Sequence, residues 1–362
     1  MRAAILTAFD PQRHTGGIES YVVQLRRLME DRGVEVDVIH GDDGPPEAGF
    51  HNELFARIYR VGRDFRARER DYDVVITNSF YGVGYFPRRC RTVNIYHATH
   101  AAFADAVKPY IAEVTHLEWG TLCGYLGEMA GGVYCERIAV SDAVAGELDR
   151  YYGFDGVPVV ESGVDLSHFR PRPRAQLRSA RLGIPEDAFV GLFIGRWDIT
   201  KGVDLVERLA AAARGVHWML VLGTGSGECP VAELDNVTVL GAVSREDLPA
   251  IYAASDFMLF PSRYEGFGLV VIEALACGLP VLATPVGVAR SLQAQPPFDA
   301  CRIAAFDAAA EEVVADVLER IRRLRDDEPF RRAVVREGLR LSAARYDARD
   351  WAGRMGDALG LP

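Results

Sequence analysis

Two carboxylates eight positions apart, Glu265 and Glu273, are the residues whose type and spacing point most directly to chemistry. Glu265 lies in a glycine-rich turn, and Glu273 lies in the helix that the pattern predicts after it. The free backbone N–H groups at the start of that helix, near residues 268–270, suit a phosphate. Glu273, about one and a half turns further on, is placed to accept hydrogen bonds from a sugar hydroxyl, as an acidic residue does for ribose in dinucleotide folds. Phosphate on amides and ribose on a carboxylate together predict a nucleotide site.

A basic pair, Arg196 and Lys201, lies in a second loop that follows a predicted strand, 188–195. Of the 41 basic side chains only two are lysines, Lys108 and Lys201. In a chain that otherwise uses arginine, a lysine indicates a position where a compact point charge is needed. One guanidinium and one ammonium can together stabilise the charge of a departing diphosphate. The alternative is an exposed basic loop without a ligand.

Two further features lie where ligands bind in open α/β sheets. Gly16 and Gly17 precede a predicted helix just after the first strand, and such a pair permits close approach of the backbone to a ligand, although it also suits a simple tight turn. His97 and His100 follow the end of the predicted strand 92–97. That position favours a site role for His97 and a structural role for His100.

The elements that position these residues alternate between apolar runs and helical patterns, twice along the chain. This alternation predicts an α/β protein with parallel sheets. Between the two halves, residues 165–174 contain Pro171 and Pro173 and are typical of a connection between domains. We therefore predict one domain over 1–165 and a second over 166–345, with a last amphipathic helix over 346–362.

Composition excludes several classes of partner and location. With 51 acidic and 41 basic side chains the net charge is −10, so a nucleic acid partner is not expected. The chain start lacks the apolar region of a secretory signal and the six cysteines are scattered, which predicts a cytoplasmic protein without a structural zinc site. Residues 53–70 form a basic amphipathic pattern; a surface helix packed on the sheet is favoured, and membrane association is the alternative.

The ordered set of motifs resembles the retaining GT-B glycosyltransferases of the glycosyltransferase family 4 (glycosyl transferases group 1) type. The stretch 265–273, followed by Gly278 and Pro280, is similar to the E-x7-E signature of that family. The pairs 16–17 and 195–196 with 201–202 resemble its N-terminal glycine loop and its diphosphate-binding basic pair. Residues 163–165 and 169–171 resemble its interdomain segment, although Ser162 stands where asparagine is usual.

The resemblance implies the GT-B fold, in which two Rossmann-like domains face each other across a cleft. It implies that the first domain binds the acceptor, that the second binds a nucleotide-sugar donor, and that the last helix returns to the first domain. It assigns a catalytic role to Glu265, His97, Arg196 and Lys201. The implied donor-binding residues are Gly16, Gly17, Arg196, Lys201, Gly225, Val243, Glu265, Gly266, Phe267, Gly268, Leu269 and Glu273.

The activity so implied is retaining transfer of a hexosyl or N-acetylhexosaminyl group from a nucleotide-diphosphate sugar, with UDP favoured, to a hydroxyl group, giving an α-glycoside. No cofactor or metal is expected, because Arg196 and Lys201 neutralise the diphosphate and Asp42–Asp43, in a Gly/Pro-rich loop, does not resemble a metal-binding pair. The acidic first domain suits a neutral or cationic small acceptor, such as an amino-sugar or aminocyclitol, better than an anionic lipid surface.

Several alternatives remain open from the sequence. The acceptor can instead be lipid-linked or a polysaccharide. A sugar-nucleotide epimerase with the same fold would act on the donor alone, and a binding-only regulator would not catalyse transfer. A dinucleotide-dependent oxidoreductase is disfavoured because no G-x-G-x-x-G follows the first strand. Glu265 is expected to act electrostatically, with double displacement through its carboxylate as the rival mechanism. The sequence does not predict the oligomeric state.

Overall fold

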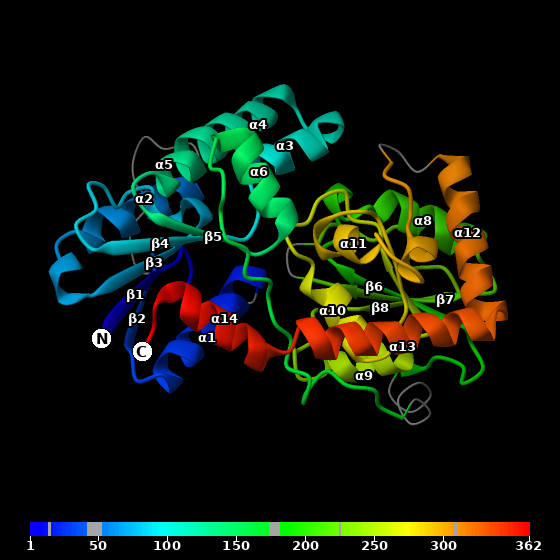
Figure 1. The fold of residues 1–362 in the computed structure, drawn as a ribbon. Helices are drawn as coiled ribbons and strands as arrows, with labels where there is room; N and C mark the ends of the chain where they lie inside the picture. Colours follow the sequence, from blue (N-terminus) through cyan, green and yellow to red (C-terminus); the bar gives the residue numbers. More distant parts are fainter. Residues whose placement is uncertain (14–15, 42–52, 174–181, 224–225, 307–309) are drawn as a thin grey trace. The chain divides into compact units, whose positions relative to one another are not determined.

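Two five-stranded sheets, each with all its strands parallel, organise the chain in the computed structural model. The structure describes residues 1–13, 16–41, 53–173, 182–223, 226–306 and 310–362 (Figure 1). One compact unit comprises Met1–Ser162 with Arg349–Pro362, and the other comprises Gly163–Ala348. The chain passes from one unit to the other after residue 162 and again after residue 348. The sequence predicted these boundaries after residues 165 and 345.

The first unit, called the N-unit below, has the strand order β2-β1-β3-β4-β5. Its inner strands are apolar runs buried on both faces, as parallel strands covered by helices require. The strands are β1 (Arg2–Leu6), β2 (Glu35–Ile39), β3 (Val74–Asn78), β4 (Arg91–Tyr96) and β5 (Glu136–Ala139). The main helices are α1 (Gly17–Asp31), α2 (Glu53–Phe65), α3 (His100–Val107), α4 (Glu113–Leu117), η4 (Glu118–Met129), α5 (Ala130–Gly132), α6 (Asp142–Tyr152) and α14 (Ala348–Leu359).

The basic amphipathic segment forms α2 and ends at Phe65, followed by a short 3-10 turn over Glu69–Asp71. Val61 and Phe65 pack into a core cluster with Leu6 and Tyr85. The apolar side of α2 is therefore occupied by the sheet, as in the favoured surface-helix interpretation. Among the described residues, no helix combines the length and apolar character that a membrane crossing needs.

Helix α14 packs against α1 within the N-unit, as the red and blue helices show in Figure 1. The rings of Trp351 and Tyr21 lie 5.6 Å apart in an edge-to-face arrangement, and the Tyr21 hydroxyl lies 4.0 Å from Sδ of Met355. Arg91, on β4, donates a hydrogen bond of 2.6 Å to the carbonyl of Leu359. These contacts join the last helix to the elements that carry the first candidate site residues.

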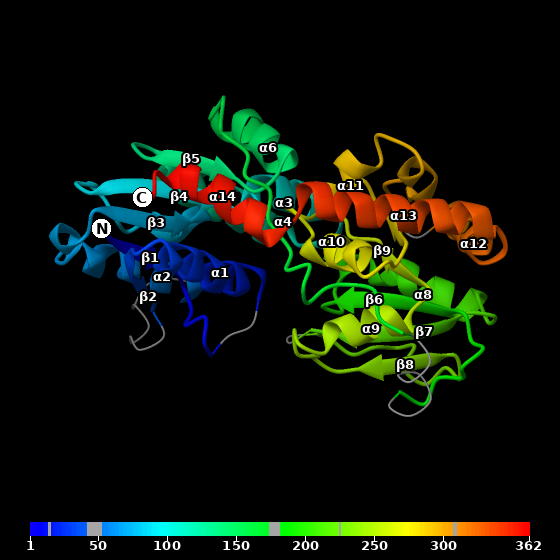
Figure 2. The same cartoon turned by 60° about the horizontal axis from the view of Figure 1, so that its bottom comes forward.

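The second unit, called the C-unit below, has the strand order β10-β9-β6-β7-β8. Its strands are β6 (Val190–Gly195), β7 (His217–Leu222), β8 (Val237–Leu240), β9 (Phe257–Phe260) and β10 (Val281–Ala283). Its helices are α8 (Val203–Ala212), α9 (Leu248–Ala254), α10 (Leu269–Ala276), α11 (Gly287–Leu292), α12 (Glu311–Asp326) and α13 (Glu328–Arg345). Helix α13 lies along α10 (Figure 2), and a Cβ on Gly338 would come within 3.0 Å of the Leu275 side chain.

Both sheets reverse their direction of winding at one point. In the C-unit, β7 and β8 lie on one side of β6, while β9 and β10 lie on the other. In the N-unit, β2 lies on one side of β1, while β3, β4 and β5 lie on the other. Crevices at such switch points, outside the carboxyl ends of the strands, are where α/β folds bind ligands. The predicted α/β fold with two Rossmann-like units is confirmed.

Candidate functional site

Lys201 and Glu265 meet at the switch point of the C-unit. The Nζ of Lys201 lies 2.5 Å from Oε1 of Glu265, and their side chains are 23% and 18% exposed. Lys201 ends the 3-10 turn η6 (Ile199–Lys201) that follows β6, and Glu265 lies in the loop that follows β9. Ser262 donates a hydrogen bond of 3.1 Å to the same carboxylate oxygen. Two residues that the sequence singled out separately are thus one charge pair.

Arg263 ties the two loops together, and sequence reasoning missed it. Its guanidinium, on a side chain only 4% exposed, binds both carboxylate oxygens of Asp204 at 2.8 Å and donates to the carbonyl of Ile199 at 2.6 Å. Gly202 has φ +71°, and a Cβ there would lie 2.2 Å from the carbonyl oxygen of Pro261. The close approach of the two loops therefore depends on a glycine and on a bidentate ion pair. No local motif marks Arg263, because its partners lie about 60 positions earlier in the chain.

Arg196 lies in the same loop as Lys201 and is more exposed, at 56% of its side chain. Its Nε lies 3.2 Å from Oδ2 of Asp198. The other oxygen of Asp198 accepts a hydrogen bond of 2.9 Å from the backbone N–H of Thr200 and so caps the turn that ends at Lys201. Asp198 therefore contacts Arg196 and also caps the turn that ends at Lys201. More than half of the Arg196 side chain is open to solvent.

The glycine-rich turn leads directly into the predicted helix, α10. Gly268 has φ +91° and precedes α10, so the turn requires a residue without Cβ there. Phe267 is buried, and its carbonyl accepts a hydrogen bond of 2.7 Å from the backbone N–H of Val288. Gly287, not singled out from sequence, has φ +50°, and a Cβ there would lie 2.3 Å from the Phe267 carbonyl oxygen. Helix α11 therefore packs against the turn and stabilises it through the Phe267 carbonyl. Gly266 lies in this turn, and Leu269 is the first residue of α10.

Glu273 lies in α10 and is buried, with 2% of its side chain exposed. Its Oε2 accepts a hydrogen bond of 3.0 Å from the Tyr252 hydroxyl, and its Oε1 lies 2.9 Å from Nη1 of Arg245. Burial raises the pKa of Glu273, against the opposing effect of Arg245. Arg245, which sequence reasoning missed, follows Val243, one of the predicted donor-binding residues, by two positions. The ribose-binding role of Glu273 stays a prediction, and Gly225 lies outside the described residues.

In the N-unit, Gly16 and Gly17 lie at the start of α1, after β1. A Cβ on Gly16 would meet Oε2 of Glu19 at 2.2 Å, whereas a Cβ on Gly17 would meet no described atom within 4 Å. The position of Gly16 is therefore crowded only by the movable end of the Glu19 side chain, and neither glycine is held close to another backbone segment that the structure describes.

His97 follows β4 and is held in one tautomer. Its Nε2 lies 2.8 Å from Oδ1 of Asn78, whose Nδ2 donates to the carbonyl of Leu6 at 3.2 Å. This network assigns the proton to Nε2 and leaves a lone pair on Nδ1. The ring packs edge-on against Tyr21, with 4.5 Å between ring centroids. By contrast, the Nδ1 of His100 lies 2.8 Å from the buried carboxylate of Glu128, in agreement with the structural role expected for His100.

Acid is expected to destabilise the protein through His97. Burial lowers the pKa of His97 from 6.5 to about 4, so the unfolded chain takes up a proton in a pH range where the folded chain does not. Stability from this residue is complete above about pH 6.5 and is lost between there and pH 4; by pH 5 the loss is about 2 kcal/mol. Urea unfolding at pH 8 and pH 5 tests this. The free energy of unfolding should differ between the two pH values by about 2 kcal/mol less in His97→Gln than in the wild type. An equal difference in both proteins would contradict the burial of a neutral ring.

Metal-binding groups do not gather in the part of the chain that the structure describes: no cluster of three or more His, Cys, Asp or Glu side chains has metal-binding geometry there. Asp42–Asp43 lies outside the described residues. Metal independence stays a prediction.

Family models match both units. The model for glycosyltransferase family 4 matches residues 15–168, and the model for glycosyl transferases group 1 matches residues 176–338. The D-inositol 3-phosphate glycosyltransferase of Kineococcus radiotolerans is 32% identical over 334 residues, covering 76% of this chain and 74% of the relative. The enzyme of the same name from Mycolicibacterium smegmatis is 30% identical, covering 75% and 71%.

Solved structures agree on the fold. Sucrose-phosphate synthase from Thermosynechococcus elongatus matches with a TM-score of 0.80 at 22% identity, covering 99% of this chain and 98% of that one. WaaG, a glycosyltransferase involved in lipopolysaccharide biosynthesis, matches with a TM-score of 0.75 at 20% identity, covering 99% of each chain. The chain therefore belongs to the family 4, group 1 glycosyltransferases and is a glycosyltransferase with the GT-B fold.

Proposed function

We propose that the protein is a retaining, metal-independent glycosyltransferase that moves a hexosyl or N-acetylhexosaminyl group from a UDP-sugar to a hydroxyl of a cyclitol or amino-sugar. The observation that carries this proposal is the Lys201–Glu265 pair at the switch point of the C-unit, beside the N-terminus of α10. HepE of Anabaena, with a TM-score of 0.70 at 19% identity and 99% coverage of each chain, was solved in complex with UDP-glucose. The curated relatives act, by name, on D-inositol 3-phosphate, a phosphorylated cyclitol.

The Lys201–Glu265 pair suits an exchange of partners on donor binding. A diphosphate carries more negative charge than one carboxylate, so it draws the Lys201 ammonium away from Glu265. The released carboxylate then accepts hydrogen bonds from hydroxyls of the donor sugar. Arg196, mostly exposed in the same loop, adds a bidentate contact to the phosphates, and the free N–H groups of α10 add amide donors.

We propose that transfer then proceeds with retention. The bond between the anomeric carbon and the phosphate oxygen breaks, and its electron pair goes to the phosphate. The acceptor oxygen bonds to the anomeric carbon on the same face, and its proton passes to the phosphate oxygen that leaves. Lys201 and Arg196 stabilise the charge that develops there. His97, with its lone pair on Nδ1, accepts a hydrogen bond from a sugar hydroxyl.

Glu273 is proposed to bind the ribose after Arg245 leaves its Oε1. A carboxylate accepts hydrogen bonds from two vicinal hydroxyls, and each such charge-assisted bond contributes about 1.5–3 kcal/mol. Glu273→Gln is therefore expected to raise the dissociation constant for UDP at least about tenfold, measured by calorimetry. Arg245→Gln is the matched control, because it removes the ion pair and leaves the carboxylate. If Arg245→Gln weakens UDP binding as much as Glu273→Gln does, the role of Glu273 is to hold the fold.

The decisive experiment combines UDP-glucose, UDP-N-acetylglucosamine and GDP-mannose with a panel of acceptors. The acceptors are inositol, inositol 3-phosphate, an aminocyclitol, an amino-sugar and a lipid-linked sugar, and release of the nucleoside diphosphate is followed. We expect release to require UDP-sugar and a cyclitol or amino-sugar, and NMR of the product to show an α-linkage. Full-rate donor turnover without an acceptor would favour an epimerase or hydrolase. A β-linked product would overturn retention, and preference for the lipid-linked sugar would overturn the acceptor class.

A further inference from the structure

The C-unit carries a pocket at the amino ends of its strands, whereas the Lys201–Glu265 pair lies beyond their carboxyl ends. Its volume is about 430 Å³, within the range of roughly 300–1,000 Å³ typical of small-molecule sites. Asp256 directly precedes β9 and Pro280 directly precedes β10, so the pocket lies at the amino ends of these strands. Lys201 and Glu265 follow the carboxyl ends of β6 and β9. The pocket is therefore separate from the proposed donor site.

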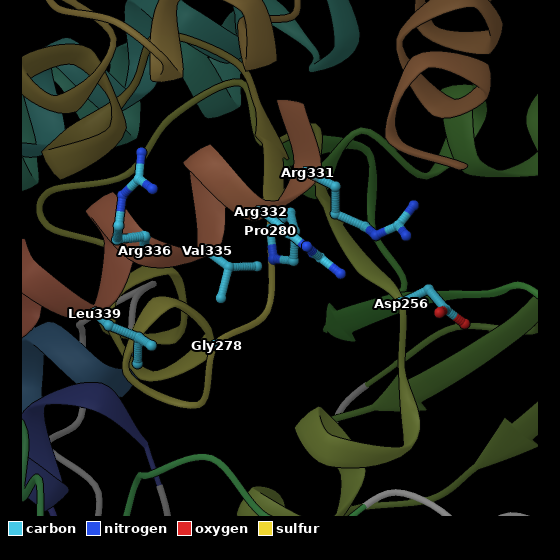
Figure 3. Close-up of a pocket in the computed structure, with 8 residues that line it drawn as sticks. All are labelled: Asp256, Gly278, Pro280, Arg331, Arg332, Val335, Arg336 and Leu339. Carbon is cyan, nitrogen blue, oxygen red and sulfur yellow. The ribbon is translucent and has the colours of Figure 1, made fainter. Parts of the chain in front are cut away.

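One stripe of α13 forms the wall of this pocket. Arg331, Val335 and Leu339 recur every four residues and share a helix face, and Arg332 and Arg336 flank them (Figure 3). The floor comes from the segment between α10 and β10. Gly278 has φ +76° there, and a Cβ on it would touch Val335 at 3.7 Å. The lining thus combines an apolar strip with three guanidinium groups.

The charge of the lining is positive, in a chain whose net charge is −10. Three arginines line the pocket with one carboxylate, that of Asp256, which already accepts a hydrogen bond of 2.8 Å from the backbone N–H of Val190. In Figure 3 the guanidinium groups of Arg331 and Arg332 extend toward the side where Asp256 lies, and that of Arg336 points away. Guanidinium groups that line a pocket together with an apolar strip suit an anion with a carbon body.

The guanidinium groups of Arg331 and Arg332 differ in how firmly they are held. Arg331 donates hydrogen bonds of 2.7 and 2.9 Å to the carbonyls of Leu324 and Arg325 at the end of α12, which fixes its position. Arg332 pairs with Glu328 at 2.6 Å, but these side chains are 75% and 57% exposed. Exposed pairs of this kind contribute little, so a ligand can displace Glu328 from Arg332.

We propose that this pocket binds a phosphate monoester with an apolar or aromatic body. Arg331 and Arg332 hold the phosphate, since the guanidinium fork matches phosphate oxygens. The body of the ligand packs on Pro280, Val335 and Leu339. The site is separate from that of the transfer reaction, because it lies at the amino ends of the strands and the Lys201–Glu265 pair lies beyond their carboxyl ends.

Calorimetric titration with phenyl phosphate tests the site. We expect phenyl phosphate to bind more tightly than inorganic phosphate, because the apolar strip contributes only to the ester. Arg332→Gln should weaken binding of phenyl phosphate at least tenfold, and Val335→Glu, which places a carboxylate in the apolar strip, should abolish it. The matched control is Arg340→Gln: Arg340 lies on the same helix, pairs with Glu337 and does not line the pocket.

The donor site is tested separately with Lys201→Ala, which should bind phenyl phosphate as the wild type does. Three results would each overturn the proposal: equal affinity for inorganic phosphate and phenyl phosphate, equal binding by Arg332→Gln and wild type, or loss of binding in Lys201→Ala. The last result would place the phosphate in the donor site instead.

Discussion

Lys201→Ala is expected to lower kcat by about 100- to 1,000-fold, the cost of removing one preorganised charge from a developing anion. Lys201 lies in a loop held by Gly202 and Arg263, with its Nζ 2.5 Å from Oε1 of Glu265, so only the ammonium has to move from the carboxylate to the diphosphate. The measurement is release of UDP from a UDP-sugar in the presence of acceptor. Lys201→Arg should recover only part of the activity, because a planar guanidinium replaces a point charge.

The chain supplies its own control for this prediction, because Lys108 is its single other lysine. Lys108 is exposed on a 3-10 turn of the N-unit, over Lys108–Tyr110, and Lys108→Ala should leave kcat unchanged. Equal losses in Lys108→Ala and Lys201→Ala would indicate a general effect of charge. Unchanged kcat in Lys201→Ala would remove the Lys201–Glu265 pair from the mechanism.

Arg263→Ala is expected to lower the free energy of unfolding by about 3 kcal/mol, because it removes a buried guanidinium that binds both oxygens of the Asp204 carboxylate. The guanidinium is nearly fully buried and also satisfies the carbonyl of Ile199, so two polar groups lose their donor at once. The loop that ends at Lys201 then loses its tie to the loop of Glu265. We therefore expect kcat to fall as well, by about tenfold or more. Urea unfolding followed by circular dichroism and the UDP-release assay measure the two effects.

The matched control for Arg263 is Arg322, whose exposed ion pair with Glu319 should contribute less than about 1 kcal/mol. A double-mutant cycle of Arg263→Ala with Asp204→Ala isolates the pair itself, and its two single-variant losses should not add. Additive losses would show that the two side chains act independently. If Arg263→Ala is destabilised but keeps full activity, the tie between the two loops is not needed for catalysis and the predicted fall in kcat is wrong.

The sequence alone was enough to predict the fold class and the residues that sequence motifs carry. Alternation of apolar runs with helical patterns is a local property, and it led to the α/β fold of two Rossmann-like units that the structure confirms. The turn around Gly268 was found from its glycines, and the φ of +91° at Gly268 explains why glycine suits that position. The pair Gly16–Gly17 was found from its place between the first strand and a predicted helix. The family followed from the order of these motifs along the chain.

Only the tertiary structure decided how the site is held. Lys201 and Glu265 are 64 positions apart, and their contact depends on β6 and β9 lying side by side at a switch point. Arg263 and Arg245 carry no local signature, because what they do depends on the distant carboxylates of Asp204 and Glu273. The tautomer of His97 depends in the same way on Asn78, at the end of a neighbouring strand. Residue types and spacing thus determined which chemistry this chain carries, and long-range packing decided which charges meet, because a side chain's partners are set by the fold and not by its neighbours in sequence.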